Sequence, residues 1–94
     1  MDCKIIDFSI KGDDRGSLIA IEQNREIPFD IKRVYYIFGT KKDVPRGHHS
    51  HKKLQQVLIA VSGSCKVKLE DGQNQLEFSL NRPDKGLFIG KNLW

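Results

Sequence analysis

The sequence has little of what would mark a secreted or membrane-spanning protein. Only two of its 94 residues are cysteines, Cys3 and Cys65, and they form no CxxC pair. We therefore expect two reduced thiols in or near the core, without a disulfide framework. No apolar run approaches the ~20 residues of a membrane span. Charges at Asp2, Lys4 and Asp7 interrupt any signal-peptide core, so we expect a cytoplasmic protein with no membrane partner.

The chain also lacks a concentrated charge of one sign. Lysine and arginine number 16 against 12 acidic residues, a net charge of +4, and the basic residues are scattered among the acids. No RNP, zinc-finger or helix-turn-helix pattern is present, so we expect no nucleic-acid partner. A small basic excess suits an anionic small molecule, such as a phosphate or a nucleotide sugar. With 38% apolar and 30% charged residues, the chain suits one globular domain over 1–94.

The sequence does contain a series of short strand patterns separated by turns. We expect strands at residues 4–10, 17–22, 33–38, 56–61, 66–70, 76–80 and 87–89, with a short extended piece at 49–53. The nearly continuous apolar run at 56–61 is expected to be buried on both faces. Asp71-Gly72 predicts a hairpin. Because no amphipathic helix is evident, we expect an all-β sandwich or barrel.

All three histidines lie within four consecutive positions. On an extended strand His49 and His51 point to the same side and His48 to the other. Imidazole titrates near neutrality, so such a pair suits either proton transfer or metal ligation. The cupin signature places a glutamate and then a glycine at set distances after His-x-His, and here Gln56 and Gly63 stand at those distances. Because neutral glutamine is a weak ligand, a tightly bound metal is not expected.

Several motifs together resemble one known family. They are Asp14-Arg15-Gly16, Ile27-Pro28-Phe29, Arg33-Val34-Tyr35-Tyr36-Ile37, Arg46-Gly47-His48-His49-Ser50-His51-Lys52, Gln56, Gly63-Ser64 and Asp71-Gly72. Over nearly its whole length the chain is similar to the nucleotide-sugar 3,4-ketoisomerases of the WxcM-like cupin group. The resemblance implies a cupin-type double-stranded β-helix, or jelly-roll barrel. Since the family's domain continues past Trp94, we expect a single cupin-like domain over 1–94 that lacks the final strands.

The resemblance also implies an activity. The keto group of a dTDP-4-keto-6-deoxyhexose would move from C4 to C3, without metal or other cofactor, in a homodimer that serves unusual deoxy- and amino-sugar synthesis. His49 and His51 would be the base at C3 and the proton shuttle between the oxygens, in an order that stays open. Tyr35 is expected to donate a hydrogen bond to the enediolate, unless Tyr36 is the inward residue of its strand.

The diphosphate of such a substrate must also be held. Arginine binds phosphate through its planar fork of N–H donors, so arginines are the first candidates. The expected substrate-binding residues are Arg15, Arg33, Arg46, Lys52 and Gln56.

Other functions stay open at this point. The chain could be a non-catalytic module that binds a nucleotide sugar or provides a dimer interface. It could be a 3,5-epimerase that acts on the same substrate class, or a metal-dependent cupin oxygenase or isomerase. The sequence does not decide between a galacto and a gluco product, or between thymine and uracil in the nucleotide.

Overall fold

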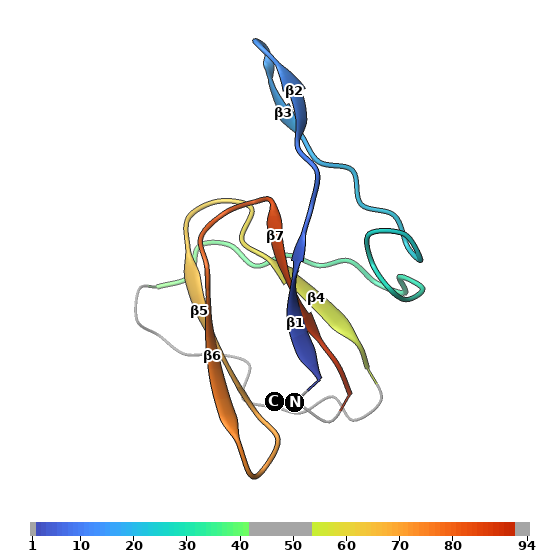
Figure 1. The fold of residues 1–94 in the computed structure, drawn as a ribbon. Helices are drawn as coiled ribbons and strands as arrows, with labels where there is room; N and C mark the ends of the chain where they lie inside the picture. The colour runs from blue at the N-terminus through green and yellow to red at the C-terminus, as the bar shows by residue number, and fades with distance from the viewer. Residues whose placement is uncertain (1, 42–53, 92–94) are drawn as a thin grey trace.

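The computed structural model describes residues 2–41 and 54–91, which form short antiparallel strands (Figure 1). The strands are β1 (Cys3–Asp7), β2 (Lys11–Asp13), β3 (Gly16–Leu18), β4 (Gln56–Ile59), β5 (Cys65–Glu70), β6 (Gln75–Leu80) and β7 (Lys85–Ile89). They make a three-stranded sheet of order β1-β7-β4 and two hairpins, β2–β3 and β5–β6. Within the described ranges, no helix is long and apolar enough to cross a membrane.

Strand β7 is the centre of the three-stranded sheet. It pairs with β1 on one side, from Cys3 opposite Ile89 to Asp7 opposite Lys85, and with β4 on the other. A strand paired on both edges is protected from water along its backbone, and four of the five β7 residues are buried, with Leu87 fully so. The Lys85 ammonium also pairs with the Asp7 carboxylate across the β1–β7 ladder.

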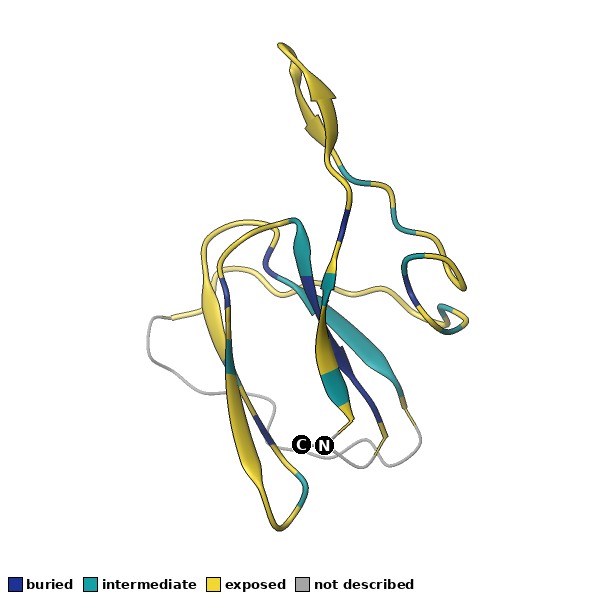
Figure 2. Ribbon diagram, in the orientation of Figure 1, coloured by how far each residue is buried: buried dark blue, intermediate teal, exposed yellow. Residues whose placement is uncertain are grey.

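The core lies between one face of this sheet and the β5–β6 hairpin. Directly opposed residues of an antiparallel pair share a face, so Leu58 and Leu87 lie side by side on it. Leu69 of β5 and Leu80 of β6 are buried against this face, the inner face of the sheet. Figure 2 shows buried positions in dark blue on both the hairpin and the sheet. Burying a leucine fully contributes roughly 1.5–3 kcal/mol, so a few such residues hold the two layers together.

The opposite face of the sheet, the outer face, is covered by aromatic rings from the N-terminal third of the chain. The Phe29 ring lies 6.3 Å from the Phe88 ring, centroid to centroid, in a tilted arrangement. Gly86 lies on the same face as Phe88, because it is two residues away on the same strand. Phe8 packs directly over Gly86, which leaves no room there for a side chain.

The β5–β6 hairpin confirms the turn predicted from Asp71-Gly72. The Asp71 carboxylate accepts hydrogen bonds from the backbone N–H groups of Gln73 and Asn74, at 2.9 and 2.7 Å. Gly72 has a φ of 94°, a conformation that glycine adopts without steric cost. The two backbone hydrogen bonds stabilise the charged carboxylate and lower the pKa of Asp71.

Several predicted strands differ from the structure. The prediction for 4–10 is wrong after Asp7, and that for 17–22 is wrong beyond Leu18, because Lys11–Asp13 and Gly16–Leu18 pair with each other in a small hairpin. The prediction of a strand at 33–38 is also wrong, because this segment has no ladder partner among the residues described. Strand β4 is half-buried throughout and ends at Ile59. The extended piece expected at 49–53 falls outside the described residues.

We expect Gly86→Ala to destabilise the fold. An added Cβ would lie 2.8 Å from the Phe8 ring, closer than such atoms approach, and 3.0 Å from Val57 Cγ1, which is a very tight contact. Overpacking of this kind costs about 1–3 kcal/mol, which chemical denaturation would detect as a lower free energy of unfolding. Ser79→Ala, at an exposed site on β6, is the control and should change little. Equal stability of the two variants would contradict the packing described here.

Candidate active site

The structure describes four of the residues predicted for the site, namely Arg15, Arg33, Tyr35 and Gln56. The other four, His49, His51, Arg46 and Lys52, lie outside the described residues, so their predicted roles stay predictions. The described residues belong to three different parts of the chain: the β2–β3 hairpin, the segment 31–41 and the start of β4.

Gln56 is the first residue of β4 and follows the histidine-bearing segment directly. It stands opposite Ile89 of β7, which in turn stands opposite Cys3 of β1. Cys3 and Ile89 pack in the core, so Gln56 shares the inner face of the sheet with them. Its side chain is half-buried. The structure therefore brings a polar amide to the end of the apolar inner face, at the point where the chain leaves the histidine segment.

Arg33 and Tyr35 lie together on one side of an extended segment. The Arg33 guanidinium carbon lies 4.9 Å from the centroid of the Tyr35 ring and over its face. Tyr36 and Phe38, which are also two residues apart, form a tilted pair of rings with centroids 6.2 Å apart. Contacts between residues i and i+2 are those of an extended chain, so the segment has the side-chain alternation of a strand although it joins no ladder among the described residues. Tyr35 is 57% exposed and Tyr36 83%, so Tyr35 is the more covered of the two.

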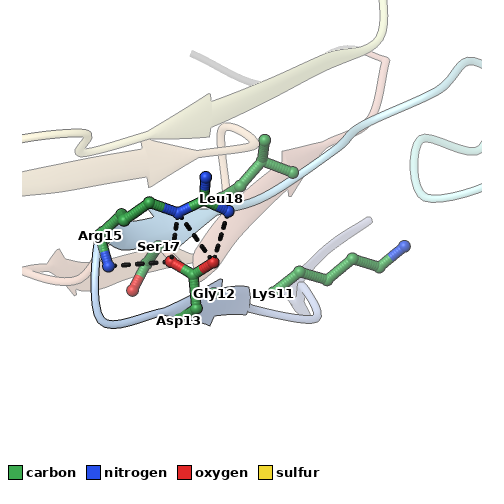
Figure 3. A pocket seen from close by; sticks show the side chains of 7 residues that line it. Lys11, Gly12, Asp13, Arg15, Ser17 and Leu18 are labelled. Carbon is green, nitrogen blue, oxygen red and sulfur yellow. Dashed lines mark hydrogen bonds and ion pairs between the residues drawn. The ribbon is translucent and has the colours of Figure 1, made fainter.

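Arg15 lies at the tip of the β2–β3 hairpin, where a carboxylate already holds it (Figure 3). Its Nε and Nη2 donate to Asp13 Oδ2 at 3.1 and 2.6 Å, and its backbone N–H donates to Asp13 Oδ1 at 2.8 Å. The guanidinium hydrogen bonds, and then the backbone one, lower the pKa of Asp13. An open hollow of about 550 Å³ lies here, and the described residues that line it belong to this hairpin.

The arginines of the described ranges fall into two groups. Arg15, Arg25 and Arg82 each pair with a carboxylate one to three residues away, as in the 2.8 Å contact from Arg82 Nε to Asp84. Arg33 pairs with no carboxylate in the described part of the chain and lies against an aromatic ring instead. A guanidinium held by a ring keeps its N–H edges available for an anion, which distinguishes Arg33 from the other three.

A family model with the description "FdtA: WxcM-like, C-terminal" matches residues 1–94. The chain belongs to this family. It is 54% identical over 94 residues to the TDP-4-oxo-6-deoxy-alpha-D-glucose-3,4-oxoisomerase of Aneurinibacillus thermoaerophilus, and the match covers all of this chain and 68% of that protein.

Solved structures of ketoisomerases also resemble the chain. A 3,4-ketoisomerase from Helicobacter canadensis is 61% identical, with a TM-score of 0.97 over all of this chain and 71% of that one. The sugar 3,4-ketoisomerase QdtA from Thermoanaerobacterium thermosaccharolyticum, in complex with TDP, is 47% identical, with a TM-score of 0.95 over 99% of this chain and 68% of that one. A variant of the same enzyme, with asparagine in place of a histidine, was solved with TDP-4-keto-6-deoxyglucose.

These likenesses confirm the family and the all-β, cupin-type fold that the sequence predicted. Two features of the site were missed in the sequence analysis. The pairing of Asp13 with Arg15 was missed because no strand was predicted at Lys11–Asp13, so the tight turn between β2 and β3 was not expected. The contact of Arg33 with Tyr35 was missed too, although their placement two residues apart on one predicted strand face was a sufficient signal.

We expect Arg15→Met to raise the pKa of Asp13 toward its ordinary value. The guanidinium favours the charged carboxylate, so the folded pKa lies below the unfolded one, and the ion pair is present at neutral pH and lost as the pH falls through the folded pKa. An NMR titration of side-chain carboxyl carbons would measure this. Asp71 is the internal control, because its low pKa depends on backbone N–H groups and should not change in the variant. An unchanged Asp13 titration would contradict the ion pair.

Proposed function

We propose that this protein is a sugar-nucleotide 3,4-ketoisomerase that moves the keto group of a dTDP-4-keto-6-deoxyhexose from C4 to C3. The observation that supports this most directly is the match of the whole chain, at 54 and 61% identity, to two enzymes with 3,4-oxo- or ketoisomerase activity. The TDP and TDP-4-keto-6-deoxyglucose complexes of the Thermoanaerobacterium thermosaccharolyticum enzyme support the substrate class.

The reaction needs two carbon-bound proton transfers and no external oxidant. A base removes the proton from C3, and the electron pair of that bond moves toward the C4 carbonyl to give an enediolate. A proton then passes from the C3 oxygen to the C4 oxygen, and a second carbon-bound proton is delivered to C4. C3 is thereby oxidised to a ketone while C4 is reduced to an alcohol. The protein must supply a base, a shuttle between two oxygens and stabilisation of the oxyanion.

We assign these tasks to a pair of histidines and a tyrosine. His49 is the base at C3 and His51 acts on the oxygens, or the reverse, because imidazole both accepts and donates protons near neutral pH. The Tyr35 hydroxyl donates a hydrogen bond to the enediolate. The crystallised histidine-to-asparagine variant of the relative is consistent with a histidine as a reacting group, since such a variant retains the substrate. No metal or other cofactor is assigned to the reaction.

We assign the nucleotide part of the substrate to basic and amide side chains. Arg33, Arg46 and Lys52 contact the diphosphate, and Gln56 contributes its amide from the inner face of the sheet. Arg15 joins this set only if it leaves Asp13, with which it forms an ion pair at the hairpin tip.

His49→Asn and His51→Asn are each expected to lower kcat by roughly 10²–10⁴-fold while TDP binding is retained. Asparagine keeps hydrogen-bonding capacity near the ring position but cannot exchange a proton at neutral pH. NMR of the sugar after incubation with the 4-keto substrate measures turnover, and calorimetry measures TDP affinity. His48→Asn is the matched control and should retain activity, because the sequence predicts that His48 points away from His49 and His51. Full turnover in both His49 and His51 variants would reject the mechanism.

Incubation of the parent protein with the 4-keto sugar, in D2O or with a chelator, separates the other candidate functions. In D2O, the proposed isomerase incorporates deuterium at C4 of the 3-keto product, whereas a 3,5-epimerase labels C5. A binding or dimerisation module binds TDP and leaves the 4-keto sugar unchanged. A metal-dependent cupin loses its activity to a chelator, and the proposed enzyme does not.

We further propose that the active form is a homodimer in the cytoplasm. Two exposed features support a second copy as the partner. Val34, Tyr36 and Phe38 form an apolar row that is 79–83% exposed, and the β2–β3 hairpin is exposed at every residue and projects from the rest of the fold (Figure 2). An isolated two-stranded hairpin is marginally stable in water, and interface cores are enriched in aromatic residues. The cytoplasmic location remains a prediction from the sequence.

Sedimentation analysis should give twice the mass of one chain. Phe38→Asp and Leu18→Asp should each shift the protein toward the monomer, because a carboxylate buried in an apolar interface is strongly unfavourable. Val61→Asp is the control, since Val61 is also 78% exposed but belongs to a turn elsewhere in the fold. A monomeric parent protein, or an equal effect of all three variants, would contradict this interface.

A further inference from the structure

We propose that Tyr35 is a positioning residue, whose ring holds the Arg33 guanidinium in place to bind the diphosphate of the nucleotide. The inference rests on the proposed function, since it concerns the same substrate. It assigns to the ring of Tyr35 a task separate from the hydrogen bond assigned to its hydroxyl.

The contact between the two side chains is the first support. The Arg33 guanidinium carbon lies 4.9 Å from the Tyr35 ring centroid, within the ~6 Å over which a cation is attracted to the face of an aromatic ring. Both side chains project to the same side of an extended segment because they are two residues apart. The stack is thus built into one short stretch of chain.

The chemistry of the guanidinium is the second support. Arginine attracts a ring through its flat face, whereas it binds phosphate through N–H donors along its edges. A ring under the face therefore restrains the side chain without using the donors that an anion needs. In Arg15, Arg25 and Arg82, by contrast, edge donors already contact carboxylates.

Restraint of Arg33 affects binding because an unrestrained arginine loses much rotamer freedom when it grips an anion. A side chain already held near its bound conformation loses less of that freedom, and the affinity rises accordingly. An exposed cation–π contact corresponds to about a 2- to 5-fold change in an equilibrium constant. The ring thus acts on nucleotide affinity, through Arg33.

Calorimetric titration of the intact protein with TDP tests this. Tyr35→Leu, which removes the ring, should raise the Kd for TDP about 2- to 5-fold. Tyr35→Phe keeps the ring and should restore the parent Kd, so that any loss in this variant falls on kcat, where the hydroxyl acts. Arg33→Met should raise the Kd about 10-fold or more, since it removes hydrogen bonds from a charged donor.

A double-mutant cycle separates positioning from a general structural effect. In the Arg33→Met background, Tyr35→Leu should have no further effect on the Kd, because the ring acts only through the guanidinium. Arg82→Met is the matched control: it removes the same charge elsewhere in the fold, where the arginine pairs with Asp84, and should leave the Kd unchanged.

Three results would overturn the inference: an unchanged Kd in Tyr35→Leu, the same effect of Tyr35→Leu on the Kd with and without Arg33→Met, or an equal rise of the Kd in Arg82→Met and Arg33→Met. A parent protein that does not bind TDP would overturn both this inference and the proposed function. A parent protein that binds TDP but leaves the 4-keto sugar unchanged would overturn the proposed function alone. The double-mutant cycle measures the Kd for TDP and does not depend on turnover.

Discussion

The packing of the β5–β6 hairpin on the inner face of the central sheet is the interaction on which the rest of the structure depends. A two-stranded hairpin alone is marginally stable, and a three-stranded sheet alone would leave an apolar face in water. Leu80 from the hairpin and Leu87 from β7 are the most completely buried side chains of the described residues, and both belong to the core cluster. This contact orders β7, and β7 in turn orders β1 and β4, including Gln56 at the edge of the candidate site.

The extended segment before the histidines has two faces of different character. On one face Arg33 lies over Tyr35, and on the other the rings of Tyr36 and Phe38 pair with each other. The first face is polar enough to meet a charged ligand, and the second is apolar and almost fully exposed. A segment of this kind suits a position between a substrate and a second protein surface, which agrees with the proposals for nucleotide binding and for the homodimer.

The parts of the fold that were predicted correctly are those set by local chemistry. The β5–β6 hairpin follows from strict alternation and from Asp71-Gly72, whose turn contacts span three residues at most. Strand β1 was predicted too long because its end is set by pairing with β7, nearly the whole chain away, as the Asp7–Lys85 pair shows. The family was identifiable from its motifs, but the ion pair of Arg15 was not, since it depends on the tightness of the β2–β3 turn.

The same spacing recurs in both halves of the proposed site. Arg33 and Tyr35 stand two residues apart, as do His49 and His51, and an extended chain places such pairs on one side. In the proposed mechanism the two pairs nevertheless act on different quantities, substrate binding and the chemical step. A restrained arginine on the diphosphate binds substrate and transition state alike and lowers KM, whereas an imidazole at C3 acts only as the proton moves and raises kcat. On this proposal, the nucleotide half of the site can be altered without changing the chemical step, as long as the segment around Arg33 and Tyr35 keeps its extended conformation.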